Sequence, residues 1–371
     1  MPLVTWDVAV VGAGPAGAAA ARAAAATGAS VLLLERAQVP RYKRCGGGLI
    51  GASQRVVRAT GLDLPALSRD DVGRVTFTSA GRREFTRTAA AFLPMVLRSE
   101  LDAALVDAAV AQGAQLRTGV TVGTYAEDAG AVTLGTGAGP VRARAVVAAD
   151  GSQGRAASYV GVVCDQVDLG LEAELPCPPG SDWAGRVLLD WGPVPGSYGW
   201  VFPKGDTLTV GVIGDRARGE AVRAYYRAFV ASLGLDLAAA QHDGGHLTRV
   251  RGASSPLRRG RVLVAGDAAG LLDPWTREGI SFALRSGALA GAAATGDPTD
   301  YAQAVGHELG PEMAAGRDAL RAFTRHPGTV HTVVRHLPGM WELFVRLVSG
   351  ETSVTEQLAR RRVRALVRVL S

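Results

Sequence analysis

The first segment of the chain carries the pattern that most restricts its fold. An apolar run, Asp7–Val11, leads directly into Gly12-Ala13-Gly14-Pro15-Ala16-Gly17, and an alanine-rich stretch then continues to Gly28. A second apolar run, Ser30–Leu34, ends in Glu35. A strand, a glycine-rich turn, a helix and a second strand in this order predict the opening βαβ unit of a doubly wound parallel sheet.

The glycines and the acid predict what this unit binds. Gly12 permits a tight turn, Gly14 lets a pyrophosphate approach the backbone, and Gly17 lets the helix pack closely on the strand. The helix N-terminus then faces the phosphates. Glu35 lies 23 residues after Gly12, close to the spacing of an acid that binds ribose hydroxyls. The unit therefore predicts a dinucleotide site.

Composition limits the remaining possibilities. With 371 residues, of which 47% are hydrophobic, the chain is long enough for two or three domains and is not disordered, collagenous or coiled-coil. The chain has a net charge of +6, but only two of its basic residues are lysines, Lys43 and Lys204, and its arginines are scattered among acidic residues. We therefore expect no nucleic-acid partner.

Cysteine and histidine placement argues against metals and disulfides. Three cysteines are an odd number without metal-ligand spacing, which favours a reducing cytosol. The histidines near the C-terminus, His326, His331 and His336, are five residues apart and do not share a helix face. We expect no metal site. The apolar run near the N-terminus has neither the basic region before it nor the cleavage site after it that a signal peptide would have. We therefore expect a cytoplasmic protein.

Later segments differ in character from the opening unit. Residues 98–112 predict a helix, strands are expected near 115–122, 144–149 and 261–265, and a long helix near 279–294. Residues 165–215 alternate apolar and polar side chains between turn signals, as in an antiparallel sheet. The fold class expected is α/β: a Rossmann-type domain, an inserted α+β substrate domain and a helical C-terminal region. The expected boundaries are 1–72, 92–160 and 250–330 for the first, 73–91 and 161–249 for the second, and 331–371 for the third.

Three further signatures together predict FAD. In 261–270, R-V-L-V-A-G-D-A-A-G, a buried strand ends at Asp267, where a carboxylate can bind a ribityl chain. In 146–151, V-V-A-A-D-G, Asp150 follows a second such strand. Arg98 opens a helix as R-S-E-L-D. Alone, Arg98 would be a surface ion-pair residue and Asp150 a turn residue.

These motifs, in this order, resemble the FAD-binding pattern of flavoproteins with a para-hydroxybenzoate-hydroxylase-like fold. Residues 40–49, P-R-Y-K-R-C-G-G-G-L, are similar to the C-G-G-G loop of the geranylgeranyl reductase family. Residues 195–203, P-G-S-Y-G-W-V-F-P, fit that family's P-x-x-Y-x-W-x-F-P signature at every fixed position. The resemblance covers roughly residues 5–330.

The resemblance implies roles for individual residues. Ala16 and Glu35 would hold the adenosine half of FAD, Gly46 and Gly48 would approach the isoalloxazine ring, and Gly279 with Ile280 would offer amides near its pyrimidine. The cofactor-binding residues expected from the motifs and the resemblance are Gly12, Gly14, Ala16, Gly17, Glu35, Arg36, Arg44, Cys45, Gly46, Gly48, Arg98, Val122, Asp150, Asp267, Gly279 and Ile280.

Catalytic and substrate residues are expected beside the flavin. Cys45 and Tyr198 are the candidate proton donors, although a thiol such as Cys45 is also a common buried space-filler. Tyr198, Trp200 and Phe202 alternate along one strand and point to one face, either as sheet core or, as the motif favours, as a cavity wall. The family commonly has glycine where this chain has Arg277, which would narrow the pocket or bind an anionic headgroup.

The expected activity is an FAD-dependent reduction of carbon–carbon double bonds in a polyprenyl or related apolar substrate. The reductant would be NAD(P)H or an electron-donor protein such as ferredoxin. One alternative is an FAD-dependent monooxygenase or oxidase acting on a specialised metabolite, since the glycine and aspartate motifs are shared with that group. Another is a non-catalytic flavin- or lipid-binding protein.

The C-terminal segment suggests a further contact. Its apolar residues lie on one helical face and its arginines on the other, a pattern typical of a helix on the inner membrane surface or of an ordinary solvated helix. The two faces are Ala359, Val363, Leu366, Val367 and Leu370, and Arg360, Arg361, Arg364 and Arg368.

Overall fold

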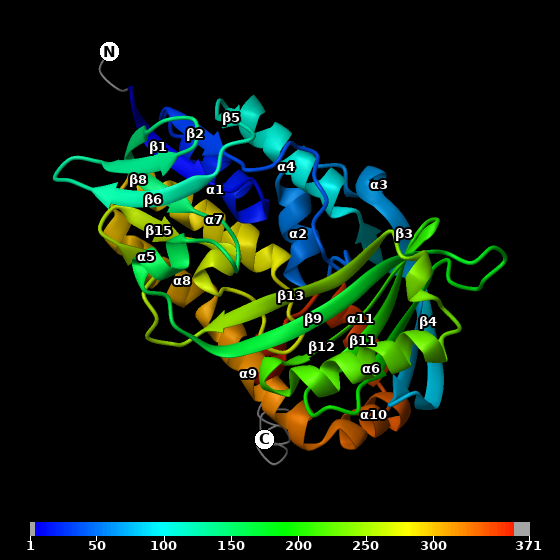
Figure 1. The fold of residues 1–371 in the computed structure, drawn as a ribbon. Helices are drawn as coiled ribbons and strands as arrows, with labels where there is room; N and C mark the ends of the chain where they lie inside the picture. The colour runs from blue at the N-terminus through cyan, green and yellow to red at the C-terminus, as the bar shows by residue number, and fades with distance from the viewer. Residues whose placement is uncertain (1–3, 360–371) are drawn as a thin grey trace.

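The computed structural model describes residues 4–359 and contains two sheets with helices packed around them (Figure 1). The arginines of the predicted amphipathic face, Arg360, Arg361, Arg364 and Arg368, lie outside the described residues, so membrane contact stays a prediction. Within residues 4–359, no helix combines the length and apolarity that crossing a bilayer requires.

The first sheet is built on the predicted βαβ unit. Its parallel strands follow the order β15-β8-β1-β2-β5, β14 pairs antiparallel to β15, and the β6–β7 hairpin joins β8. The bounds are β1 Thr5–Val11, β2 Val31–Leu34, β5 Gln115–Arg117, β6 Val122–Glu127, β7 Val132–Thr136, β8 Val141–Ala148, β14 Arg258–Arg259 and β15 Val262–Val264. The central strands are continuous runs of valine, leucine and alanine because helices or the hairpin cover both of their faces.

The second sheet has the strand order β13-β9-β12-β11-β10-β3-β4 and is antiparallel except between β10 and β3. Its strands are β3 Ser68–Ser79, β4 Arg82–Val96, β9 Cys164–Pro176, β10 Arg186–Trp191, β11 Tyr198–Lys204, β12 Thr207–Asp215 and β13 His242–Arg251. One face carries a core that includes Val201 and Val212, against helix α6, Gly219–Ser232. The opposite face looks toward the first domain (Figure 1).

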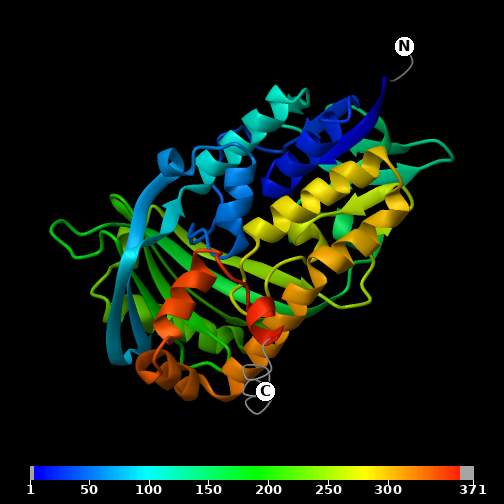
Figure 2. The ribbon, with the colours of Figure 1, turned by 180° about the vertical axis from the view of Figure 1, so that it is seen from behind.

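The other helices surround the first sheet or close the second. They are α1 Pro15–Ala25, α2 Ala52–Ala59, α3 Leu64–Leu67, α4 Arg98–Ala111, α5 Ala156–Val160, α7 Ile280–Thr295, α8 Tyr301–Glu308, α9 Gly310–Arg325, α10 Pro327–His336, α11 Met340–Val348 and α12 Val354–Ala359, with short 3₁₀ turns η1 Arg216–Arg218, η2 Leu237–Ala239, η3 Gly266–Ala269 and η4 Pro298–Asp300. Seen from behind, the C-terminal helices run from the first domain across to the second sheet (Figure 2).

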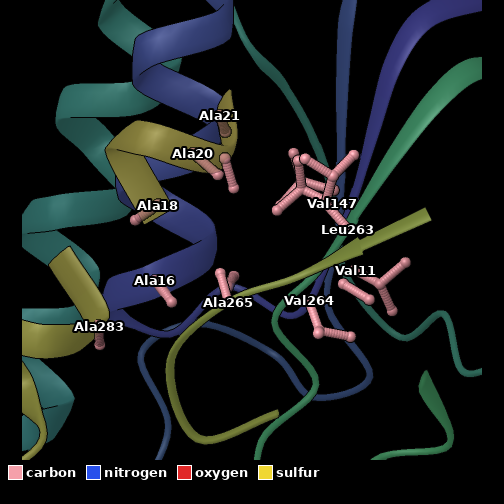
Figure 3. Packing of buried hydrophobic residues seen from close by; sticks show 14 of the residues in the cluster. Val11, Ala16, Ala18, Ala20, Ala21, Val147, Leu263, Val264, Ala265 and Ala283 are labelled. Atoms are coloured by element: carbon pink, nitrogen blue, oxygen red, sulfur yellow. The ribbon is translucent and has the colours of Figure 1, made fainter. Parts of the chain in front are cut away.

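Helices α1 and α7 pack unusually closely because small residues line both (Figure 3). A Cβ on Gly287 would overlap the carbonyl of Ala16, and one on Gly291 would overlap the carbonyl of Ala20. Proline at the first position and alanine throughout favour α1 as a helix. The contact aligns the N-termini of both helices at the same edge of the first sheet.

Most of the predicted elements are confirmed. The opening βαβ unit, the helix from Arg98, the strand at 262–264 and the long helix after Gly279 all form as expected. The region expected as one strand at 115–122 is instead β5 and the start of β6, with a break between them. The domain boundaries stay a prediction, and β3 and β4 enter the second sheet over Ser68–Val96.

The α1–α7 contact yields a stability prediction. Gly287→Ala should lower the free energy of unfolding by about 1–3 kcal/mol, because the added methyl group overpacks a backbone contact. Gly306→Ala, in α8, is the matched control: its Cβ meets nothing within 4 Å, so helix propensity should raise stability by about 0.5–1 kcal/mol. Urea unfolding of both variants measures these changes. Equal changes in the free energy of unfolding would contradict the tight packing of α7 on α1 at Gly287.

Candidate active site

A cavity of about 830 Å³ lies between the first sheet and the inner face of the second, within the size range of small-molecule sites. The structure brings almost every predicted site residue to its wall. All the expected cofactor and substrate residues line it except Gly17. A Cβ on Gly17 would overlap the carbonyl of Gly12, so this glycine serves helix–strand packing, as its place in the motif predicts.

The N-terminus of α1 is open toward the cavity. Its first turn contains no acidic residue and its N-cap, Gly14, offers no side-chain cap. A Cβ on Gly14 would meet only the Arg41 guanidinium, at 3.5 Å, whereas one on Gly12 would overlap the Ala149 carbonyl. Packing within the protein therefore requires glycine at 12 but not at 14. A helix N-terminus left open in this way fits a pyrophosphate.

Three charged side chains, Glu35, Arg41 and Asp102, form a row of ion pairs along the same edge. Glu35 accepts hydrogen bonds from the amides of Ala13 at 2.8 Å and Ala37 at 3.1 Å. The Arg41 guanidinium lies 3.4 Å from Glu35 and 3.2 Å from Asp102. These pairs fix a buried carboxylate at the end of β2, where the sequence predicts a ribose contact.

Arg98 binds Asp102, the same carboxylate that Arg41 contacts. Its guanidinium binds the Asp102 carboxylate in two places, at 2.8 and 3.0 Å. Although burial opposes its charge, the Asp102 carboxylate raises the pKa of Arg98, and Cys45 adds to this effect. Arg98 thus lies between the predicted phosphate-binding edge and the predicted catalytic thiol.

The two aspartates that follow parallel strands differ in their surroundings. One oxygen of Asp150 accepts the Ala156 amide at 3.1 Å, and burial raises its pKa. The Asp267 carboxylate accepts no hydrogen bond from residues 4–359, and its Oδ1 lies 3.4 Å from the Cβ position of Gly279. Asp267 is therefore free to accept hydroxyl groups beside the N-terminus of α7, as FAD's ribityl chain requires.

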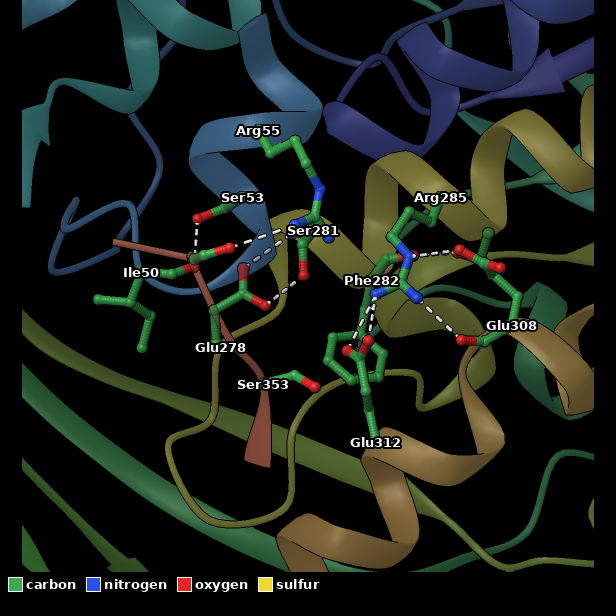
Figure 4. A network of polar contacts seen from close by, with 12 residues as sticks. Ile50, Ser53, Arg55, Glu278, Ser281, Phe282, Arg285, Glu308, Glu312 and Ser353 are labelled. Atoms are coloured by element: carbon green, nitrogen blue, oxygen red, sulfur yellow. Dashed lines mark hydrogen bonds and ion pairs between the residues drawn. The ribbon is translucent and has the colours of Figure 1, made fainter. Parts of the chain in front are cut away.

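The N-terminus of α7 is closed by Glu278 (Figure 4). Its carboxylate accepts the Ser281 amide at 2.8 Å and the Ser281 hydroxyl at 2.7 Å. Burial raises the pKa of Glu278 to about 7. Deeper in α7, Arg285 binds Glu308 and Glu312 at 3.0 and 2.9 Å, which fastens α7 to α8 and α9 and keeps the Gly279–Ile280 amides in place.

The C-G-G-G loop packs directly on strand β11. A Cβ on Gly46 would stand 2.8 Å from the ring of Phe202 and 3.5 Å from the indole nitrogen of Trp200. The buried ammonium of Lys204 donates to the Cys45 carbonyl at 3.1 Å and lies 3.7 Å from Glu174. Two motifs that are far apart in sequence therefore form one surface of the cavity.

The rest of this surface is apolar. Tyr198, Trp200 and Phe202 all line the cavity, which is the arrangement that their alternation predicts. Leucine, valine and tryptophan side chains of β3 and β10 extend the wall, and α11 covers it from the far side. The residues that do so are Val75, Val187, Leu189, Trp191, Phe344, Leu347 and Val348.

Arg277 connects the loop before α7 to the second sheet. Its backbone has φ of 57°, a conformation that favours glycine. Its guanidinium binds both oxygens of Asp168 at 3.1 Å, donates to the Trp275 carbonyl at 2.6 Å and lies 5.7 Å from the Tyr198 ring centre. Because an anionic headgroup would have to displace the buried Asp168, this geometry favours the narrowing role over headgroup binding.

Several residues of the site were not predicted from the sequence. Arg41 lies one residue into the P-R-Y-K-R-C segment and carried no motif of its own. Lys204 directly follows the nine-residue signature, and as one of only two lysines it was a visible signal. Nothing in the local sequence indicates the inner-face residues of β9 and β13, or the cover provided by α11, because these arise from tertiary pairing.

Known proteins resemble the chain over most of its length. A family model described as an FAD binding domain matches residues 5–169. A menaquinone reductase of Mycolicibacterium smegmatis is 30% identical over 344 residues, 85% of this chain and 83% of that protein. A digeranylgeranylglycerophospholipid reductase of Methanopyrus kandleri is 31% identical over 319 residues, 77% and 79% of the two chains.

Solved structures share the fold. A geranylgeranyl bacteriochlorophyll reductase-like protein of Thermoplasma acidophilum has a TM-score of 0.78 at 20% identity and covers 100% of both chains. A flavin-dependent brominase has a TM-score of 0.74 at 20% identity, with 99% of this chain and 98% of that chain covered. The architecture therefore accommodates more than one flavin chemistry.

Because the N-terminus of α1 is open, a larger side chain at Gly14 should weaken FAD binding without destabilising the fold. Gly14 has φ of −81°, which any residue adopts, so Gly14→Val should leave apoprotein stability within about 0.5 kcal/mol. FAD affinity should fall by about ten- to a hundredfold through steric overlap. Gly137→Val, whose Cβ meets nothing within 4 Å, is the control. Flavin absorbance after dialysis measures retention, and normal retention by Gly14→Val would refute the assignment.

The Arg277–Asp168 pair predicts a strong energetic coupling. Arg277→Gly should lower the free energy of unfolding by about 3 kcal/mol, because it leaves Asp168 charged and buried with the Gln166 amide as its one remaining side-chain donor among residues 4–359. Adding Asp168→Asn should recover most of that loss. A double-mutant cycle from urea unfolding of the holoenzyme should give a coupling of about 2 kcal/mol. If the two single substitutions changed the free energy of unfolding additively, Arg277 and Asp168 would not be energetically coupled.

Proposed function

The chain belongs to the geranylgeranyl reductase family of FAD-dependent oxidoreductases, and on that premise we propose that it saturates carbon–carbon double bonds of a polyprenyl or related apolar substrate. The observation that carries the proposal is the apolar wall of the cavity, built from Tyr198, Trp200 and Phe202 and covered by α11. It begins at the C-G-G-G loop and therefore directly beside the predicted flavin position.

The residues of the first domain fit FAD. The open N-terminus of α1, the guanidinium of Arg98, the free carboxylate of Asp267 and the amides of Gly279 and Ile280 line one continuous edge of the cavity. FAD, when bound and reduced, supplies the hydride that such a reaction needs. The protein's own contribution is to place an alkene and a proton donor beside it.

The apolar wall has two consequences for the chemistry. It orients a flexible chain, because an aliphatic substrate gains free energy wherever it covers apolar surface. It also excludes water, so that a proton reaches the alkene only from a protein group. An unactivated alkene accepts hydride poorly, which makes the position of that proton donor decisive.

Of the two predicted proton donors, the surroundings favour Cys45. The Tyr198 hydroxyl already donates to the Thr276 carbonyl at 2.5 Å, and burial raises its pKa to about 12. Cys45 lines the cavity, and the Lys204 ammonium donates to its carbonyl at 3.1 Å. We assign Tyr198 to positioning, since its hydrogen bond ties β11 to the loop before α7, and Cys45 to proton transfer.

Oxygen chemistry is the second candidate function. The similarity to a flavin-dependent brominase at a TM-score of 0.74 is the observation that favours it, because that protein places a flavin in the same architecture. The electron donor proposed for either function is NAD(P)H or a protein such as ferredoxin, so a chemical reductant is the appropriate first choice in an assay.

The experiment is mass spectrometry of a prenyl-lipid pool incubated with FAD-loaded, chemically reduced protein under argon and under air. Gain of hydrogen pairs under argon is expected. Cys45→Ala should slow this gain by about a hundredfold or more. Cys177→Ala, a half-buried thiol hydrogen-bonded to Ser181 and outside the cavity wall, should retain the wild-type rate. Gain of oxygen only in air would replace the reductase with a monooxygenase.

A further inference from the structure

Part of the cavity wall on the second sheet is polar, in contrast to the apolar surface beside it. We call the side chains of Arg44, Glu172, Trp200 and His246 the polar wall. All four line the cavity. They lie across strands β9, β11 and β13 and the loop before Cys45, and no part of the proposed hydride and proton transfer uses Glu172, His246 or Arg44.

Glycines on the sheet create the room for these side chains. In one cross-strand row, Trp200 pairs with Gly211, Gly211 with Glu172, and Glu172 with Gly244. A Cβ on Gly211 would overlap the Trp200 indole, and a Cβ on Gly244 would stand 2.6 Å from the Arg44 guanidinium. The indole and the guanidinium therefore lie over the two glycines that flank Glu172.

The next row repeats the arrangement. Tyr198 pairs with Ile213, Ile213 with Gly170, and Gly170 with His246. A Cβ on Gly170 would stand 2.8 Å from the imidazole. The sheet thus brings a donor, an acidic acceptor, a second donor and an imidazole onto neighbouring positions of one face.

Five polar atoms of this wall have no hydrogen-bond partner within residues 4–359. Both carboxylate oxygens of Glu172, the indole nitrogen of Trp200, Nε of Arg44 and Nδ1 of His246 are buried without a hydrogen bond. Glu172 is 1% exposed and Trp200 6%. Buried polar groups without partners are rare and costly, and several together in a cavity indicate a ligand.

The chemistry of these atoms specifies that ligand. An ionised carboxylate only accepts hydrogen bonds, an indole only donates, and a hydroxyl group does both. Building on the proposed function, we propose that the polar wall binds a neutral hydroxyl group, an alcohol or phenol, at the end of the apolar substrate. The hydroxyl donates to Glu172 and accepts from Trp200 or Arg44.

The cations near the wall do not form a phosphate site. Lys204 is paired with Glu174 and the Cys45 carbonyl, Lys43 donates to the Arg44 carbonyl at 3.5 Å, and Nη2 of Arg44 donates to the Asp243 carbonyl at 3.4 Å. A phosphate here would meet the Glu172 carboxylate. Burial raises the pKa of Glu172 to about 6, despite the opposing charges of Lys204, Lys43 and Arg44.

His246 adds no positive charge. Burial, together with Lys43 and Arg44, lowers its pKa to about 4, so the imidazole is neutral at physiological pH. Anchoring the hydroxyl end at this wall while the chain follows the apolar surface would fix which double bond lies beside Cys45. The polar wall therefore determines the position of reduction as well as the substrate class.

The test measures ligand binding to the oxidised holoenzyme through the change in flavin absorbance, without turnover. The probes are geranylgeraniol, the hydrocarbon with hydrogen in place of its hydroxyl, and geranylgeranyl diphosphate. We expect the alcohol to bind about tenfold or more tightly than the hydrocarbon. Glu172→Leu should abolish that preference, and the milder Glu172→Gln and Trp200→Phe should each reduce it severalfold.

Glu174→Gln is the matched control. Glu174 is a second buried carboxylate on β9, but it is paired with Lys204 and lies outside the cavity wall, so its substitution should preserve the ratio of alcohol to hydrocarbon affinity. Equal wild-type affinity for alcohol and hydrocarbon, or tighter diphosphate binding, would overturn the inference. So would loss of FAD from Glu172→Gln with an unchanged ratio, since the wall would then serve the flavin. Binding of no prenyl probe would instead overturn the proposed function itself.

Discussion

The contact between the C-G-G-G loop and strand β11 is the constraint on which the rest of the site depends. Gly46 lies so close to the Phe202 ring that a Cβ would stand 2.8 Å away, and Lys204 holds the Cys45 carbonyl at 3.1 Å. This contact joins the first domain's loop to the second sheet on the cavity wall, where FAD and substrate are proposed to meet. Glycine is required here by the protein's own packing, whatever it also does for the flavin.

The cavity is divided chemically by the register of the second sheet. Because each strand presents alternate residues to the cavity, the pairing of β11, β12, β9 and β13 decides which side chains stand next to one another. It places the aromatic residues of β11 beside a carboxylate of β9, with Gly211 between them. An apolar substrate with one polar end matches this division better than a uniformly apolar or strongly charged one.

Arg277 illustrates how a departure from a family pattern is accommodated. A side chain at a backbone conformation that favours glycine costs about 1 kcal/mol. Here its guanidinium satisfies the buried Asp168 and lies over Tyr198, so the loop before α7 is tied to the second sheet. The sequence showed the substitution, but its consequence depended on Asp168, which is more than a hundred residues away.

Short stretches of sequence were enough to predict the elements of the first sheet and the edge at which a dinucleotide is expected to bind. Glycine spacing, helix propensity and apolar runs act over a few residues, and they were sufficient to predict β1, α1, β2, α4 and α7. The resemblance to a known family supplied many of the expected cofactor residues; all of the expected ones except Gly17 line the cavity, and their roles stay a prediction. Three relations in the site became visible only from the folded chain: Lys204 donates to the Cys45 carbonyl, Asp168 binds Arg277, and Glu172 lies beside Trp200 without a hydrogen bond. These relations depend on strand register and domain packing, which bring together residues that are far apart in the sequence and that no local sequence pattern connects.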